Sequence, residues 1–309
     1  MNLNQRVLQS VAFIGIKKEG SFTPRATAFF VRYTDGTHHF NHVVTAEHVV
    51  SGLLTAGHEI WLRINLVDGG TWESKMDHSA FCFHPEAERS PTDVAVSPIN
   101  IPFINNAANS RADVLTLPIN GPTSFVAKAE WAQRYIGLGT EVAAVGLFRS
   151  HYGKSKNVPV IRVGNISAMP TEPVFTKYAG YLEAYLIEAR SIAGLSGSPV
   201  FVVPDPAEFI AEGLANKGDE NFPTACLLGL MHGHFDVRNL NEDVVTEDDM
   251  ASPSGIHTGM GVVIPVHKIV ETINHPDLAK SRKAIVDQPR TASESANFDA
   301  AEATNEQAR

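Results

Sequence analysis

The chain has 309 residues, 43% of them hydrophobic and 19% charged, which suits a compact globular protein and argues against wholesale disorder. Its formal net charge of -9 makes a general phosphate-binding surface, and so a nucleic-acid partner, a poor expectation. The N-terminus shows no secretory signal pattern, and no apolar run approaches the roughly 18 residues of a membrane-spanning helix, so we expect a cytoplasmic protein without a membrane partner.

Short strands separated by turns dominate the first half of the chain. Runs rich in β-branched and aromatic residues, with turn signals between them, predict β-structure. The predicted strands cover residues 11–16, 26–33, 40–45, 60–67, 71–75 and 94–96. His48 follows the third strand in a short turn, and Asp93 stands at the entrance of the sixth. We assign residues 1–120 to an N-terminal domain of the barrel or sandwich type.

The second half repeats this pattern after a linker at residues 121–138. Its predicted strands cover residues 139–146, 158–168, 181–188, 200–203, 226–231 and 261–266. Apolar residues at i, i+3, i+4 and i+7 from Val266 predict a short helix over residues 267–273. Residues 139–275 form the second predicted domain, and residues 276–309, poor in large apolar side chains, are predicted to be a disordered tail.

Residues 194–201 (Gly-Leu-Ser-Gly-Ser-Pro-Val-Phe) place Ser196 between two glycines. Gly194 and Gly197 permit backbone conformations that other residues resist, so the turn can aim successive N–H groups at one point. Such donors form an oxyanion hole, which stabilises the charge that develops on an attacked carbonyl oxygen. The pattern indicates a nucleophilic Ser196, although an ordinary hairpin loop has the same composition.

Three residues in chain order, His48, Asp93 and Ser196, are of the types that nucleophilic catalysis needs. A serine hydroxyl is a weak nucleophile until a nearby base takes its proton, and a neutral imidazole does this near neutral pH. A buried carboxylate on the far imidazole nitrogen fixes the tautomer and stabilises the imidazolium. Taken singly, the three residues also fit structural roles: a core histidine, a strand-capping aspartate and a turn serine.

The segments around these residues resemble the signature blocks of a known family. Residues 45–48 (Thr-Ala-Glu-His), 93–96 (Asp-Val-Ala-Val) and 194–199 (Gly-Leu-Ser-Gly-Ser-Pro) look like the three catalytic blocks of the trypsin-like (chymotrypsin-fold) serine peptidases, in that family's order. The resemblance spans residues 10–273. It implies an all-β protein of two antiparallel six-stranded β-barrels with the active site between them, followed here by the short helix and the tail.

Carried over to the matching positions, the resemblance implies that His48 is the general base and acid, Asp93 its orienting partner and Ser196 the nucleophile. Gly194 and Ser196 would supply the N–H groups of the oxyanion hole. These roles imply a serine endopeptidase that forms an acyl-enzyme with a protein or peptide substrate. We expect neither a metal nor another cofactor.

Two departures from the family pattern are informative. Leu195 stands where secreted members carry an aspartate that pairs with a newly formed N-terminus, so activation by N-terminal processing is not expected. Cys82 and Cys226 are the two cysteines of the chain, and the disulfides of the family are missing. Both departures resemble the bacterial or intracellular branch of the family.

The resemblance also leads to a hypothesis on specificity. In the family the base of the S1 pocket lies six residues before the nucleophile, and Arg190 occupies that position. We expect Arg190 to favour an acidic P1 side chain, because a guanidinium pairs well with a carboxylate. The alternative is an arginine that faces solvent or ties down the pocket loop.

Residues 228–231 (Leu-Gly-Leu-Met) resemble the strand that flanks the substrate cleft in the family, so Met231 and the following His232 and His234 are predicted to contact substrate. His232 and His234 alternate along the strand and are expected on one face. With Asp236 they also form a His-x-His-x-Asp pattern that suits a metal ion. We prefer the cleft-lining role.

Two classes of function remain open on the sequence. The first is the serine endopeptidase. The second is a protease-fold binding module, or an autoinhibited protease, whose cleft holds a partner segment. An esterase of the α/β-hydrolase type is not expected, because the chain lacks the alternating strands and helices of that fold and its chain order of catalytic residues.

Overall fold

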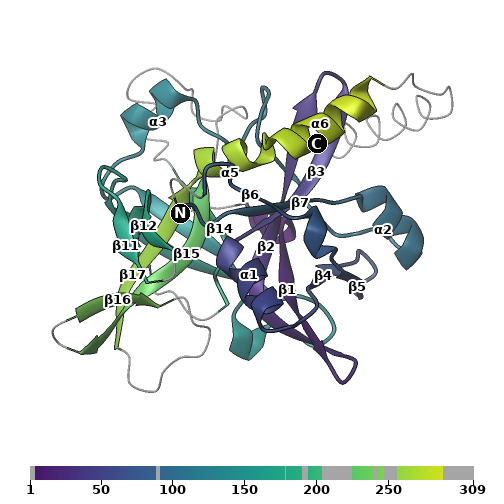
Figure 1. Cartoon of the computed structure of the whole chain (residues 1–309), viewed down its shortest axis with the longest axis horizontal. Coiled ribbons are helices and arrows are strands. Elements are labelled where there is room, and N and C mark those ends of the chain that lie inside the picture. Colours follow the sequence, from purple (N-terminus) through teal and green to yellow (C-terminus); the bar gives the residue numbers. More distant parts are fainter. Residues whose placement is uncertain are drawn as a thin grey trace.

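The computed structural model describes residues 4–87, 91–177, 179–189, 194–203, 225–239, 242–246 and 256–287. Over these residues the chain forms two halves, each built on one large and mainly antiparallel sheet (Figure 1). We refer to the first, formed by β1 to β8, as the N-terminal sheet and to the second as the C-terminal barrel.

The N-terminal sheet has eight strands among the described residues: β1 (Val11–Lys18), β2 (Ser21–Asp35), β3 (His38–Thr45), β4 (Trp61–Asn65), β5 (Thr71–Lys75), β6 (Cys82–Phe83), β7 (Ala95–Pro98) and β8 (Leu117–Pro118). Their order is β5-β4-β1-β2-β3-β7-β6, and β8 runs parallel to β2. The six strands predicted from the sequence are present. The two additional strands, β6 and β8, have two residues each, too few to show an alternating pattern.

The C-terminal barrel is closed by a pairing between its first and last strands. Its members, in sheet order, are β14 (Pro199–Val202), β9 (Glu141–Gly146), β10 (Val160–Ala168), β13 (Tyr185–Glu188), β17 (Ile256–Pro265) and β15 (Cys226–Asn239), and β15 pairs back with β14. β16 (Glu242–Thr246) pairs with β15 at the margin, while β11 (Val174–Thr176) and β12 (Gly180–Leu182) form a separate hairpin. The predicted all-β architecture is confirmed, with six strands in this closed barrel and eight in the N-terminal sheet.

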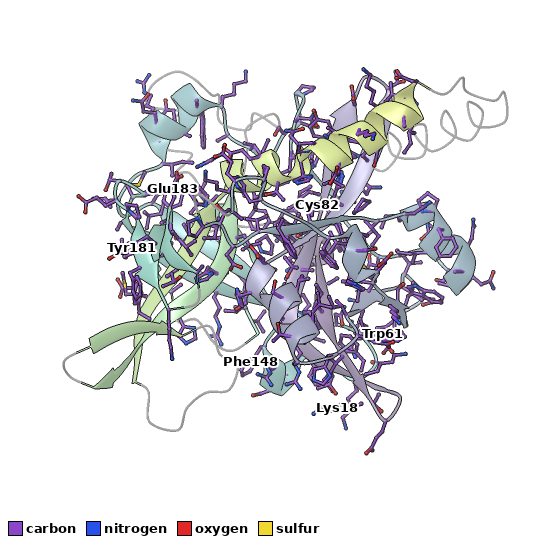
Figure 2. All side chains as sticks on the ribbon, viewed as in Figure 1. Lys18, Trp61, Cys82, Phe148, Tyr181 and Glu183 are labelled. Atoms are coloured by element: carbon purple, nitrogen blue, oxygen red, sulfur yellow. The ribbon has the colours of Figure 1, made fainter. Side chains whose placement is uncertain are left out.

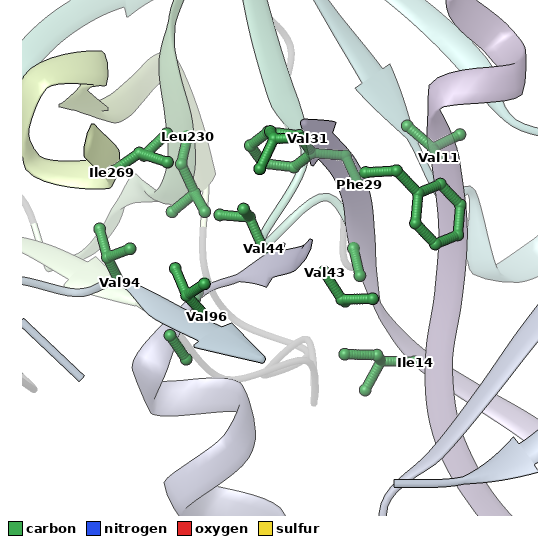
Figure 3. Packing of buried hydrophobic residues seen from close by; sticks show 14 of the residues in the cluster. Val11, Ile14, Phe29, Val31, Val43, Val44, Val94, Val96, Leu230 and Ile269 are labelled. Carbon is green, nitrogen blue, oxygen red and sulfur yellow. The ribbon is translucent and has the colours of Figure 1, made fainter. Parts of the chain in front are cut away.

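One buried apolar cluster joins the two halves. Val44 and Val96 of the N-terminal sheet belong to the same cluster as Leu230 of β15 and Ile269 of α5 (Val266–Ile273), and all four side chains are 0% exposed (Figure 3). Burial of each such side chain stabilises the fold by about 1.5–3 kcal/mol relative to exposure. Because the core is continuous, the loops that meet between the halves are supported from both sides.

A polar contact also joins the halves. Arg63 of β4 is 4% exposed and donates to Oδ1 of Asn157 at 2.7 Å, while Nδ2 of Asn157 donates to the carbonyl of Arg63 at 2.7 Å. Asn157 lies in the loop between β9 and β10. Figure 2 labels Phe148, early in this loop, and Trp61 of β4. This reciprocal pair holds the loop against the N-terminal sheet.

The α-helices of the described residues are short, with 7 to 11 residues each. Besides α5, the structure contains α1 (Glu47–Thr55), α2 (Ile101–Ala108), α3 (Ala129–Tyr135), α6 (Pro276–Val286) and the 3-10 turns η1 (Gln5–Ser10), η2 (His78–Ala80) and η3 (Arg149–His151). α5 confirms the predicted helix, whereas α1 replaces a predicted turn and α3 lies within the predicted linker. Within the described residues, no helix has the length and apolar character needed to cross a membrane.

Residues 276–286 correct a prediction, because they form α6 and not part of a disordered tail. Two of its side chains one turn apart, Leu278 and Arg282, are buried. The guanidinium of Arg282 lies 4.4 Å from the ring centre of Tyr33 and donates to the carbonyl of Ile273 at 2.6 Å. A count of large apolar residues misses this helix, because an arginine supplies part of its buried surface. Residues 288–309 lie outside the described part.

Candidate active site

His48 lies in the first turn of α1, immediately after β3 has ended at Thr45. The first N–H groups of a helix lack partners within the helix, and Ala46 at the N-cap offers no side-chain acceptor. Asp93 supplies one from another segment: its Oδ1 accepts the backbone N–H of His48 at 2.8 Å, and its Oδ2 binds Nδ1 of the same residue at 2.8 Å. Two contacts to one carboxylate thus fix both the start of the helix and the imidazole.

Asp93 precedes β7 and is 2% exposed. Its Oδ2 also binds Nδ1 of His232 at 2.5 Å. Burial alone would raise the pKa of Asp93, but attraction to His48 and His232 and the hydrogen bonds from both rings hold that pKa well below its usual range. The carboxyl group is therefore ionised at neutral pH, and both Nδ1 atoms act as N–H donors to it.

Ser196 lies in the turn that precedes β14 and is 9% exposed. Gly194 and Gly197 have φ angles of 103° and 80°, in the region that favours glycine. A Cβ on Gly197 would approach the carbonyl oxygen of Thr27 to 2.2 Å and Oγ1 of Thr45 to 2.4 Å. The turn is therefore packed against β2 and β3, which brings Ser196 to the segment that carries His48.

Thr27 of β2 fixes the shape of this turn, a role that the sequence analysis missed. Its Oγ1 donates to the carbonyl of Gly194 at 2.8 Å and accepts the N–H of Leu147 at 2.9 Å. Its own N–H donates to the carbonyl of Ser196 at 3.0 Å. In the sequence, Thr27 is marked as the one polar residue within the apolar run at residues 26–31. In the structure it is 0% exposed, and a buried polar group needs hydrogen-bond partners.

The structure thus brings His48, Asp93 and Ser196 into one buried cluster. The link to the serine runs through His232, whose backbone carbonyl accepts a hydrogen bond from Oγ of Ser196 at 3.1 Å. The rings of His48 and His232 meet edge to face, with centroids 5.3 Å apart. A chain of hydrogen bonds through His232 therefore connects Ser196, from one half of the molecule, to Asp93 and His48, from the other.

The residues predicted to contact substrate lie in different environments. Met231 and His232 are 1% and 0% exposed, so neither side chain is open to a peptide at the surface. His234 is partly exposed. Arg190 lies outside the described residues, as does the side chain of Asp236. The substrate contacts expected of Arg190, Met231, His232 and His234 stay predictions.

The ligand atoms of His48, Asp93 and His232 lie within 4.8 Å of one another, which makes the cluster a candidate metal site. Ligands about 2.0–2.1 Å from a tetrahedral zinc ion stand more than about 3 Å apart. Here Oδ2 of Asp93 is 2.8 Å and 2.5 Å from the two Nδ1 atoms, which are hydrogen-bond distances. In this arrangement the three side chains bind one another and leave no coordination position between them.

Glu47, which precedes His48, is a second titratable group that the sequence analysis did not single out. Burial and the negative charge of Asp93 raise the pKa of Glu47 to about 7, against the opposing influence of His48. Its charge therefore changes near neutral pH, beside the candidate base.

Comparisons with known proteins bear on the fold. No protein-family model matches the chain, and no curated protein does. The MamO protease domain from Magnetospirillum magneticum, in its apo form, is similar with a TM-score of 0.50 at 16% identity, over 87% of this chain and 97% of that one. Deg5 gives a TM-score of 0.47 at 14% identity, over 88% and 90% of the two chains. With its N-terminal sheet and closed six-stranded barrel, the chain has the fold of the trypsin-like serine proteases.

Proposed function

We propose that this protein is a serine endopeptidase whose substrate is a protein or peptide. The observation that carries the proposal is the buried hydrogen-bonded cluster in which Asp93 binds Nδ1 of His48 while Ser196 is tied to the same carboxylate through His232. In this proposal His48 is base and acid, Asp93 holds its tautomer, and Ser196 is the nucleophile. The fold supports the proposal but does not by itself determine an activity.

The proposed reaction passes through an acyl-enzyme. Oγ of Ser196 attacks the peptide carbonyl carbon while Nε2 of His48 accepts the hydroxyl proton, and the ionised Asp93 stabilises the imidazolium. The tetrahedral intermediate then breaks its C–N bond, and the imidazolium gives the proton to the departing amine. Water, deprotonated by His48 in turn, hydrolyses the ester and releases the second product.

We assign the oxyanion hole to the N–H groups of Gly194 and Ser196. The N–H of Ser196 donates to no acceptor among the described residues, so it is available to a bound oxyanion. The left-handed backbone at Gly194 shapes the turn that presents it. Backbone donors of this kind act on the charge that appears in the transition state.

A second candidate, an autoinhibited protease or a protease-fold binding module, rests on one further observation. The hydroxyl of Ser196 donates to the carbonyl of His232 at 3.1 Å, so the serine must change its hydrogen-bond partner before His48 can take its proton. Catalytic hydrogen bonds often tighten only when substrate binds. The second candidate differs in that a partner, and not the substrate, would drive the change.

Labelling with a fluorophosphonate, read by intact mass, tests the proposal. The wild type is expected to gain one adduct, and Ser196→Ala and His48→Ala are expected to gain none. Ser198→Ala is the matched control, because its hydroxyl is buried two residues away without a hydrogen-bond partner among the described residues, and it should label like the wild type. No adduct on the wild type would contradict an assembled nucleophile and favour the second candidate.

Two finer predictions belong to this proposal and rest on the sequence. Arg190 would favour an acidic P1 side chain, and the compartment would be the cytoplasm. Cleavage of a peptide library measures the first directly, and products without a preference for aspartate or glutamate at P1 would contradict it.

A further inference from the structure

His232 of β15 touches both parts of the candidate triad. Its backbone carbonyl accepts from Oγ of Ser196 at 3.1 Å, and its ring binds Oδ2 of Asp93 at 2.5 Å. The ring is 0% exposed and comes from the C-terminal barrel, whereas Asp93, just before β7, and His48, in α1, belong to the N-terminal half. A single residue therefore connects the nucleophile in one half to the base and its carboxylate in the other.

Charge and burial account for the strength of this connection. A buried polar ring is costly unless it is hydrogen-bonded, and a buried carboxylate is costly unless donors surround it. The bond between His232 and Asp93 satisfies both groups, and hydrogen bonds to an ionised acceptor are stronger than neutral ones. Because Oδ2 also accepts from His48, the carboxylate is held on both sides and cannot rotate freely away from the base.

We propose that His232 is a positioning residue of the site: its ring holds the carboxylate of Asp93 in the orientation that binds His48. The proposal rests on the proposed peptidase function. It gives His232 an inward-facing role, in place of the substrate contact that its position on the strand predicts. The ring of His232 acts on His48 through Asp93, while its backbone carbonyl is the partner of the Ser196 hydroxyl in this structure.

The first test is the proton position on His232, which does not depend on activity. NMR of the protein labelled with ¹⁵N-histidine is expected to show His48 and His232 with a proton on Nδ1, each shifted far downfield by the shared carboxylate. His232→Gln should remove one of these two signals and leave that of His48. A neutral His232 that carries its proton on Nε2 alone would overturn the proposal, because it could not donate to Asp93.

The second test compares two amide substitutions. The amide nitrogen of asparagine occupies nearly the position of Nδ1 of histidine, whereas that of glutamine lies nearer Nε2. His232→Gln is expected to slow fluorophosphonate labelling on the order of 10- to 100-fold through loss of a charge-assisted hydrogen bond. His232→Asn should recover at least about fivefold of that loss.

The pH profile separates positioning from a general packing defect. Without the bond from His232, the full charge of Asp93 acts on His48, so the acid limb of the labelling profile should move to higher pH in His232→Gln and less in His232→Asn. Glu47, whose pKa is raised to about 7, also changes charge near neutral pH, so both variants are also measured in a Glu47→Gln background. Leu228→Ala, buried on the same strand, controls for packing and should lower the melting temperature without moving this limb.

Each outcome bears on one of the two proposals. A reactive wild type with equal rates and equal acid limbs for His232→Asn and His232→Gln would overturn the positioning role and leave the proposed function standing. An unreactive wild type would contradict the proposed function and, with it, any catalytic effect of His232.

Discussion

At the scale of single residues, the site depends on one buried carboxylate. Among the described residues, Asp93 accepts two hydrogen bonds from His48 and one from His232. The two rings and their hydrogen bonds outweigh burial and keep the pKa of Asp93 well below its usual range. Its negative charge is therefore available to stabilise an imidazolium at His48.

Substitution of this carboxylate by an amide tests its charge with little change in shape. Asp93→Asn is expected to lower kcat/KM for peptide hydrolysis by about 10³- to 10⁴-fold, because the uncharged amide no longer fixes the Nδ1–H tautomer of His48. Asp113→Asn changes a carboxylate that binds Gln9 outside the site and serves as the control. A loss smaller than about tenfold in Asp93→Asn would contradict the role given to Asp93.

Glu47 makes stability depend on pH in a calculable direction. Its pKa is raised to about 7 in the folded state, from about 4.3 in an unfolded chain. Between these values the folded protein binds the extra proton, so the stabilising contribution of Glu47 is full at low pH and is lost as the pH rises through about 7. Asp93 behaves oppositely: its contribution is present above the pKa of the unfolded carboxyl and is lost as the pH falls through its lowered folded pKa.

Glu47→Gln is therefore expected to behave differently at two pH values. The free energy of unfolding of the variant, minus that of the wild type, should rise by about 1 kcal/mol between about pH 5 and about pH 8. This is less than the full pKa shift of Glu47 implies, because solvent screens a half-exposed carboxyl. Denaturant unfolding at both pH values measures this difference. If the variant differs from the wild type by the same free energy of unfolding at both pH values, Glu47 does not titrate with a raised pKa.

At the scale of elements, the serine turn takes its shape from the strands behind it. Gly197 combines a φ angle of 80° with a close approach to the carbonyl oxygen of Thr27. Gly36 also has a positive φ, of 56°, but a Cβ there meets nothing within 4 Å. The two glycines therefore separate the effect of backbone strain from that of a clash.

Gly197→Ala is expected to reduce the free energy of unfolding by about 3 kcal/mol or more and to abolish fluorophosphonate labelling, because β2 cannot retreat from the turn. Gly36→Ala should cost only about 1 kcal/mol, the penalty of a left-handed backbone, and should label normally. Similar losses of stability in both variants would show that the turn is not pressed against β2.

α6 is stabilised by a buried arginine. Arg282→Ala removes the contact with Tyr33 and the hydrogen bonds to Ile273 and Asn274, and is expected to reduce the free energy of unfolding by about 2 kcal/mol. Lys280→Ala, on the exposed side of the same helix, should stay within about 0.5 kcal/mol of the wild type. Thermal unfolding of both variants measures this, and equal midpoints would contradict a docked α6.

At the scale of the whole molecule, the strands could be predicted, and three candidate site residues could be proposed, because both depend on local signals in the sequence. β-branched runs mark β1, β2 and β3, and the residues next to His48, Asp93 and Ser196 carry the family resemblance. The helices α1 and α6 were missed because each depends on a distant group. Asp93 caps the first, and Tyr33 packs under the second.

The position of His232 could not be predicted for a related reason. It lies 139 positions from Asp93, and its face of the strand depends on the pairing register. β15 and β17 change register between Met231 and Gly233, so the strict alternation that places His232 and His234 on one face does not hold there. At this bulge His232 is buried, whereas the alternation along the strand predicted a residue that lines the cleft.

The proposed endopeptidase is tested most directly by cleavage of an unfolded protein by the purified chain, with the new termini identified by mass spectrometry. Wild-type protein is expected to cut at internal peptide bonds, and Ser196→Ala, matched in stability and concentration, is expected to cut at none. The same cleavage by both proteins would show that Ser196 is not the nucleophile. A wild type that binds the substrate but leaves it intact would contradict the endopeptidase and support a protease fold used for binding.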